Sequence, residues 1–308
     1  MTTPAIRTRD LSKRFGRLMA VDGLDLVVDQ GEIFGFLGPN GAGKSTTMRL
    51  LLHAIRPTRG EAWIMGIPAR DVERAHRRIS YVPGDVALWP QLTGAETLAL
   101  LGALAGGADP AVRAELVERL DLDPDVRVRS YSKGNRQKVA LVAAFMTRPD
   151  VLLLDEPTSG LDPLMEAQFQ ALVREAAARG QTVLLSSHLL DQVEDVCDRV
   201  AILREGRLVE MSALRDLRHL ATNVLEATLD GPVPDLTAVP GVLAVDRRGP
   251  VVRVTYSGSP AEVLRRLAPA GIGRLRSHEP TLEEVFLTYY DASPEQRQAV
   301  ADAHGLGR

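Results

Sequence analysis

The chain has 308 residues, 45% of them hydrophobic, and a formal net charge of −3. This length suits two domains, and the near-neutral charge gives no support for nucleic-acid binding. The single cysteine, Cys197, excludes an internal disulfide and is expected to be a buried apolar residue. No apolar run reaches the roughly 18 residues that span a bilayer. Charged residues interrupt the N-terminus, so we expect no signal peptide and predict a cytoplasmic protein.

The first part of the chain is predicted to be β-rich, with strands at 5–11, 24–28 and 33–37. Phe15 lies between the first two of these strands. Its ring could stack on a purine base, or it could simply belong to the core. The sequence alone leaves these two interpretations open.

The stretch Gly38-Pro39-Asn40-Gly41-Ala42-Gly43-Lys44-Ser45 matches the phosphate-loop pattern G-x-x-x-x-G-K-[ST]. It follows a predicted buried strand and precedes a predicted helix at 45–52, so that backbone N–H groups and a helix N-terminus converge on one hollow. Lys44 adds a charge for the outer phosphates, and Ser45 a hydroxyl for a magnesium ion. Thr46 is a further candidate contact. The alternative is an ordinary glycine-rich turn.

The middle of the chain is predicted to be helix-rich after two more strands, 61–65 and 79–82. A capping box at Thr93 begins one helix, and Asp109-Pro110 begins another that ends near Leu120.

Ser132, followed by Gly134 and an apolar helical run at 139–146, offers a second anion site. A plain helix N-cap explains the same residues, and without further evidence it is favoured.

Two acids follow a predicted buried strand at 151–154, at the sheet edge where α/β proteins bind ligands. Asp155 could hold magnesium and Glu156 could take a proton from an attacking water, although solvated loop acids would show the same pattern. Asp162-Pro163 begins a helix that ends at Gly180. His188 follows the next predicted strand, 182–185, and could donate to an outer phosphate or have a structural role.

A hairpin at 200–210 ends this part of the chain, and beyond about residue 220 the organisation changes. Strands are predicted at 224–229, 242–246 and 251–256, and capping boxes at Ser259 and Thr281. We therefore expect three segments: a nucleotide-binding domain at 1–220, a small α+β domain at 221–292, and a flexible tail at 293–308.

With the phosphate loop, residues 131–138, 152–156 and 159–162 and His188 in this order, the first 220 or so residues resemble the ATP-binding subunit of ABC transporters. The resemblance implies an α/β fold, with a P-loop NTPase (RecA-like) core, an antiparallel β subdomain and a helical subdomain at about 86–146. The ending at 279–286 is similar to the drug-exporter branch, typified by daunorubicin-resistance proteins.

The resemblance also implies roles for single residues. Phe15 would stack on adenine, Asp155 would support Mg²⁺, Glu156 would be the catalytic base, and Lys44 and His188 would contact the phosphates. Ser132, Gly134 and Asn135 correspond to the family's signature, which covers ATP held by the opposite subunit. Asp162 would lie in the loop that communicates across that dimer.

Two departures from the family pattern stand out. Gly84 replaces the usual glutamine, which leaves Asp85 as a substitute candidate for the metal. In the signature, Lys133 replaces the first of two glycines, and Asn135 stands where glutamine is usual.

We therefore predict an ATP-hydrolysing subunit that energises export of a hydrophobic compound through a separate membrane permease. Its cofactors would be ATP and Mg²⁺. Its partners would be the permease and a second ATP-binding subunit, with a homodimer favoured. It would act at the cytoplasmic face of the membrane. The alternatives are a soluble ATPase acting on ribosomes or DNA, a protein that only binds nucleotide, and a transporter subunit for another cargo such as a lipid, ion or polysaccharide.

Overall fold

The computed structural model describes residues 3–187, 193–214, 223–236, 239–256 and 259–278. The chain divides into two compact units, 1–213 and 214–308. The boundary expected near residue 220 falls among residues 215–222, which lie outside the described part.

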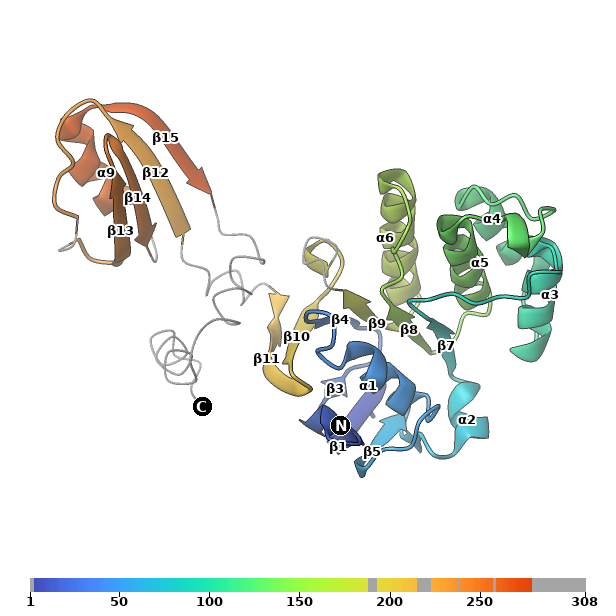
Figure 1. The fold of residues 1–308 in the computed structure, drawn as a ribbon. Coiled ribbons are helices and arrows are strands. Elements are labelled where there is room, and N and C mark those ends of the chain that lie inside the picture. The colour runs from blue at the N-terminus through green and yellow to red at the C-terminus, as the bar shows by residue number, and fades with distance from the viewer. Residues whose placement is uncertain (1–2, 188–192, 215–222, 237–238, 257–258, 279–308) are drawn as a thin grey trace. The chain divides into compact units, whose positions relative to one another are not determined.

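The first unit is built on a sheet of order β11-β10-β4-β9-β8-β7, parallel except for the β10–β11 hairpin (Figure 1). Its strands are β4 (Ile33–Leu37), β7 (Ile79–Val82), β8 (Val151–Asp155), β9 (Thr182–Ser187), β10 (Arg199–Arg204) and β11 (Arg207–Ala213). Every residue of β4, β8 and β9 is buried. A strand buried on both faces reads as one apolar run, which is why the sequence located these strands closely.

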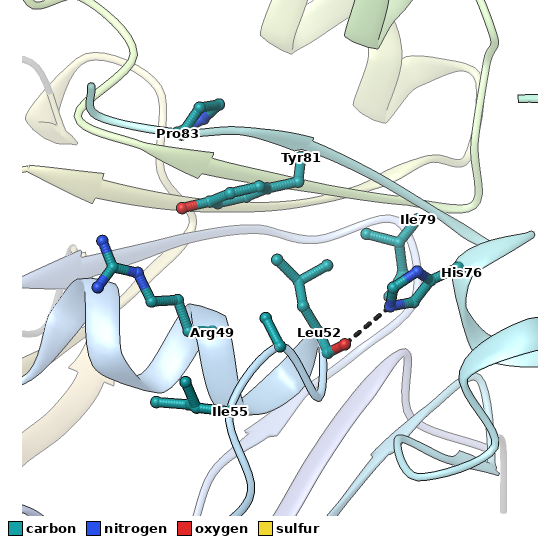
Figure 2. A pocket seen from close by; sticks show the side chains of 8 residues that line it. Arg49, Leu52, Ile55, His76, Ile79, Tyr81 and Pro83 are labelled. Atoms are coloured by element: carbon teal, nitrogen blue, oxygen red, sulfur yellow. Dashed lines mark hydrogen bonds between the residues drawn. The ribbon is translucent and has the colours of Figure 1, made fainter. Parts of the chain in front are cut away.

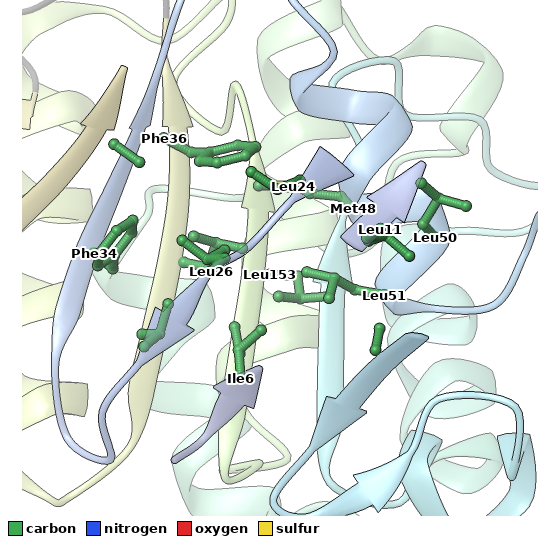
Figure 3. Packing of buried hydrophobic residues seen from close by; sticks show 14 of the residues in the cluster. Ile6, Leu11, Leu24, Leu26, Phe34, Phe36, Met48, Leu50, Leu51 and Leu153 are labelled. Carbon is green, nitrogen blue, oxygen red and sulfur yellow. The ribbon is translucent and has the colours of Figure 1, made fainter. Parts of the chain in front are cut away.

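A second, antiparallel sheet contains β1 (Ile6–Phe15), β2 (Leu18–Leu24), β3 (Val27–Val28), β5 (Arg59–Ile64) and β6 (Ile67–Pro68). The sequence prediction missed β2 because only Val21 and Leu24 of its residues are buried, so that no alternating apolar pattern marks the strand. Side chains of this sheet, of β4, of β8 and of α1 (Lys44–Leu51) form one core (Figure 3). Helix α1 is therefore held between the two sheets' apolar side chains, which fixes the loop that precedes it.

The helical part of this unit contains α3 (Gly94–Leu104), α4 (Pro110–Arg119), the short 3-10 helix η1 (Val128–Ser130) and α5 (Lys133–Phe145), while α2 (Val72–His76) packs on β6 and β7. The capping box at Thr93 is confirmed: its side chain accepts from the Glu96 amide at 3.1 Å, and the Glu96 carboxylate accepts from the Thr93 amide at 2.8 Å. Helices α3 and α4 both pack on α5 (Figure 1). Helix α6 (Pro163–Ala178) follows β8, and Cys197 is buried as expected.

The second unit is a four-stranded antiparallel sheet of order β13-β14-β12-β15, with α9 (Ala261–Leu267) and a 3-10 turn, η2 (Ala268–Ala270). Its strands are β12 (Asn223–Leu229), β13 (Val242–Arg248), β14 (Val251–Tyr256) and β15 (Ile272–His278). The sequence prediction missed β15, whose seven residues include one glycine and two arginines. Alternate residues of β12 and β14 pack against α9 in a small core.

The capping box predicted at Ser259 is wrong. Helix α9 begins after Pro260, without a side-chain cap, and Ser259 Oγ instead accepts from the Ala261 amide at 3.3 Å. Glu262, which should have completed the box, pairs with Arg265 at 2.8 Å. The Glu262 carboxylate therefore pairs with the Arg265 side chain, about one turn along the helix, instead of accepting from the Ser259 amide. The second predicted box, at Thr281, lies outside the described residues.

An arginine on α4 ties the helical part to α6. Arg119 donates from its two terminal nitrogens to both carboxylate oxygens of Glu175, at 2.8 and 2.6 Å, and from Nε to Gln168 at 3.2 Å. The hydrogen bond from Arg119 lowers the pKa of Glu175 below its usual 4.5, against a smaller opposing effect of burial. Because this two-bond geometry is specific to arginine and carboxylate, the pair orients the two helices relative to each other.

We predict that Glu175→Gln lowers the melting temperature at neutral pH and that the difference from the wild type shrinks as the pH falls. A carboxyl group with a lowered pKa stabilises the fold above its unfolded-state value of 4.5, and this contribution is lost as the pH falls through the folded-state pKa. Since the pair is partly exposed, the effect is at most about 1 kcal/mol. Thermal melts between pH 3 and 7 check this. Glu118→Gln, at an exposed position of α4, is the control, and equal melting curves for Glu175→Gln and the wild type would contradict the prediction.

Candidate functional site

The loop 38–43 joins β4 to α1 and adopts backbone conformations that only glycine tolerates. Gly43 caps α1 with φ of 107°, and a Cβ atom there would lie 2.5 Å from the carbonyl oxygen of Ala20. A Cβ at Gly38 would lie 2.6 Å from the carbonyl oxygen of Leu203. The loop is thus pressed against β2 and β10, so its path is fixed before any ligand binds.

Lys44 is the first residue of α1, and its side chain is 4% exposed. Its Nζ donates to the carbonyl oxygens of Gly38 at 2.6 Å and Pro39 at 3.2 Å and lies 3.7 Å from Oε1 of Glu156. Burial lowers the pKa of Lys44, while Glu156 and Asp155 act to raise it. The phosphate loop therefore holds the Lys44 ammonium group in place.

The two predicted acids lie beside this lysine. Asp155 ends β8 and is 3% exposed, and its Oδ1 accepts from Ser186 Oγ at 2.6 Å. Glu156 follows with φ of +46°, which is uncommon for a residue with a side chain and marks backbone strain of the kind found at functional sites. The interpretation as solvated loop acids is therefore wrong for Asp155, which is buried.

Ser186, near the end of β9, contacts both acids, and the sequence prediction did not select it. Besides its bond to Asp155, its carbonyl oxygen and Oγ accept from the Glu156 amide at 3.2 and 3.1 Å. It is fully buried. The available signal was a serine at the end of a buried strand, but only the β8–β9 pairing shows that it lies beside Asp155.

Tyr81 on β7 lies near Asp155 and was not selected either. Burial is the main cause that raises the pKa of Tyr81 to about 12; the charge of Asp155 also raises this pKa, and that of Arg49 lowers it. Figure 2 shows the Tyr81 hydroxyl pointing toward Arg49, in a pocket of about 600 Å³ that Tyr81 and Arg49 line with Leu52, Ala54, Ile55, His76, Ile79 and Pro83. No residue of the phosphate loop lines this pocket.

Phe15 ends β1, and its side chain is 48% exposed. The ammonium group of Lys13 lies 5.0 Å from the centre of its ring. The core interpretation is therefore wrong, and the ring is open to a planar ligand. Asn40 and Gly41 at the tip of the phosphate loop are exposed, while Ser45 and Thr46 at the start of α1 are half-buried.

The signature residues lie at the start of α5. Ser132 is the N-cap, and its Oγ accepts from the Asn135 amide at 3.1 Å, as the plain capping interpretation predicts. Gly134 lies against the carbonyl oxygen of Gly160, so closely that a Cβ atom would clash. Asp162 in turn caps α6, accepting from the amides of Leu164 and Met165 at 3.0 Å.

Gly84 lies directly beside the acids: a Cβ atom there would be 3.3 Å from the carbonyl oxygen of Asp155 and 3.8 Å from Cβ of Glu156. Asp85, the substitute candidate for the metal, is exposed in the following turn. His188, the remaining candidate, lies outside the described residues.

The oxygen atoms present fit a magnesium ion. Ser45 offers a hydroxyl at the start of α1 and Asp155 a buried carboxylate, and Mg²⁺ takes few protein oxygens together with waters and phosphate oxygens. Among the described residues, no group of three or more histidine, cysteine or acidic side chains could hold a metal ion.

We predict that Ser186→Ala lowers the rate constant of ATP hydrolysis about 10- to 100-fold, because both acids lose a hydrogen-bonding partner, while ATP affinity changes little. Phosphate release and binding of a fluorescent ATP analogue check the two parts. Ser80→Ala is a matched control. Ser80 lies on β7 of the same sheet, and the substitution removes a half-buried hydroxyl that bonds Thr147 at 2.9 Å. An equal loss in both variants would show that the effect is general weakening of the sheet.

Within the described residues, no helix has the length and apolar character needed to cross a membrane. A family model described as ABC transporter matches residues 21–159. DrrA, the daunorubicin/doxorubicin resistance ATP-binding protein of Streptomyces peucetius, is 38% identical over 74% of this chain and 71% of its own. DrrA3, the daunorubicin resistance ATP-binding protein of Streptomyces coeruleorubidus, is 36% identical over 93% of this chain and 96% of its own.

Two solved structures place the fold. An ATP-binding subunit of an ABC transporter aligns with a TM-score of 0.65 and 34% identity, covering 70% of this chain and 92% of that one. A dimeric ATP-binding cassette bound to ADP and phosphate aligns with a TM-score of 0.63, covering 68% and 99%, and at 24% identity this likeness concerns the fold alone. The expected α/β, P-loop NTPase fold is confirmed. With relatives that extend over nearly all of its length, the chain belongs to the ABC transporter family, as one of its ATP-binding, ATP-hydrolysing subunits.

Proposed function

We propose that this subunit energises export of a hydrophobic compound or drug through a separate membrane permease. The observation that carries the proposal is the extent of the likeness to DrrA3, which covers 93% of this chain and so includes most of the second unit. Since the second unit has no nucleotide motif, this match extends beyond the part of the chain that nucleotide binding requires.

The geometry supports the following roles in hydrolysis. The backbone of residues 38–43 and the Lys44 ammonium group bind the triphosphate, and Phe15 stacks on the base. Glu156 takes a proton from the attacking water, while Ser186 keeps its backbone in place. Ser45 and Asp155, with Asp85 as a further candidate, hold Mg²⁺, which when bound offsets the negative charge of the phosphates. Catalysis here is positioning and charge stabilisation, without a covalent intermediate.

We propose further that two copies of the chain close on ATP. Ser132, Gly134 and Asn135 would cover the nucleotide of the second copy, with Asp162 in the loop between the two sites. Closure would drive the permease at the cytoplasmic face of the membrane, and hydrolysis would reopen the pair. His188 would contact the γ-phosphate.

A second candidate function is export of another kind of cargo. The Nod factor export ATP-binding protein I of Bradyrhizobium diazoefficiens is 35% identical over 93% of this chain and 96% of its own. This protein matches the present chain almost as closely as DrrA3 does, so both cargo classes need to be tested.

Two substitutions separate binding from hydrolysis. We predict that Lys44→Ala weakens ATP affinity at least about tenfold, because the buried ammonium group is the main cation of the hollow. Glu156→Gln should leave affinity nearly unchanged and lower the rate constant of hydrolysis by about 10²- to 10⁴-fold, because the amide cannot accept the proton. Titration with a fluorescent ATP analogue and a phosphate-release assay measure the two effects. Normal turnover by Glu156→Gln would refute its role as the base.

The export proposal predicts that a multi-spanning membrane protein co-purifies with the tagged chain and stimulates its ATP hydrolysis in lipid vesicles. Daunorubicin-like compounds should then accumulate in inside-out vesicles only with ATP, and Glu156→Gln should abolish the accumulation. Co-purification with ribosomes or DNA, without a membrane protein, would favour the soluble alternative. Transport of other cargo with no response to drugs would favour the second candidate.

A further inference from the structure

We propose that Lys133 is a positioning residue that ties the start of α5 to the loop 156–162, and so couples the signature to Glu156 of the same chain. The inference rests on the proposed closure of two copies, in which the signature covers ATP of the second copy. It concerns a residue that departs from the family pattern, which has glycine at this position.

The first observation is the contact itself. Nζ of Lys133 donates to Oγ of Ser159 at 2.7 Å. The stem of the side chain runs beside Gly160, where an added Cβ atom would lie 3.5 Å from Cγ and 3.6 Å from Cδ of Lys133. Glycine at position 133 could make neither contact.

Two neighbouring residues of α5 hold the same loop. Gly134 lies against the carbonyl oxygen of Gly160, and Nε2 of the buried Gln137 donates to the carbonyl oxygen of Pro157 at 2.9 Å. The helix therefore contacts the loop through Lys133, Gly134 and Gln137, and of these contacts only that of Lys133 is a hydrogen bond between two side chains.

The loop in turn is braced against Glu156. The Ser159 amide donates to the Glu156 carbonyl oxygen at 3.1 Å, and the Leu161 amide to Thr158 at 3.0 Å. Ser186 holds Glu156 from the other side. A shift of Ser159 is thus passed to the backbone of the base through one hydrogen bond.

Among the described residues, no carboxylate lies within ion-pair distance of the Lys133 ammonium group. A direct contact of this group with a phosphate of the second copy is the rival explanation, and it requires no contribution from Ser159. The experiment must therefore remove the two ends of the hydrogen bond separately.

The test is a double-mutant cycle on the full-length chain, with ATP hydrolysis measured at saturating ATP in the absence of a permease. Lys133→Met and Ser159→Ala should each lower kcat about five- to tenfold, and the double variant should lose no more than either single one. KM for ATP and the affinity for a fluorescent ATP analogue should stay unchanged. Lys133→Arg, which keeps the donor, should recover most of the rate.

Arg129→Met removes an exposed cation just before the signature and is the control for general charge effects; melting temperatures confirm that each variant is folded. A loss in Lys133→Met with full activity in Ser159→Ala would overturn the proposal in favour of the direct phosphate contact. Additive losses, or a rise in KM without a change in kcat, would overturn it too. Because the assay contains no permease, failure of the export proposal would leave these readings intact.

Discussion

A buried ammonium group is the feature on which the site depends. Removing a cation from water is costly unless oxygen atoms replace the water, and here they come from Gly38, Pro39 and Glu156. This requirement explains why the loop folds over Lys44 and why an acid follows β8. In the proposed binding mode, an incoming triphosphate would find its counter-charge already in place, so that little reorganisation would be needed.

The order of the strands brings the phosphate loop and the two acids together. Strands β4, β9 and β8 lie side by side, so the phosphate loop, Ser186 and the two acids all meet at one edge. Ser186 lies at the centre of this group, because its hydroxyl and carbonyl bond both Asp155 and the backbone of Glu156. Parallel pairing with complete burial fixes the register of these strands, and hence these distances.

The loop after β8 has a second role as the support of α5. Its short hydrogen-bonded turns place Ser159 and Gly160 under the signature and end with Asp162 as the cap of α6. The bond between Arg119 and Glu175 joins the same helical part to α6 further along. The helical part is therefore joined to the rest of the unit by two connections, Lys133–Ser159 near the site and Arg119–Glu175 farther along α6. A rotation of the helical part relative to the sheet would change both connections.

The sequence by itself determined the phosphate loop, the buried strands, the cap at Thr93 and the acids after β8, because each depends on residues adjacent in the chain or on one apolar run. It also indicated the family, through the order of these motifs. Tertiary structure alone decided that Phe15 is exposed, that Ser186 bonds Asp155, that Lys133 bonds Ser159, and that 272–278 forms a strand. These features depend on pairing between segments far apart in the chain, which no local pattern records.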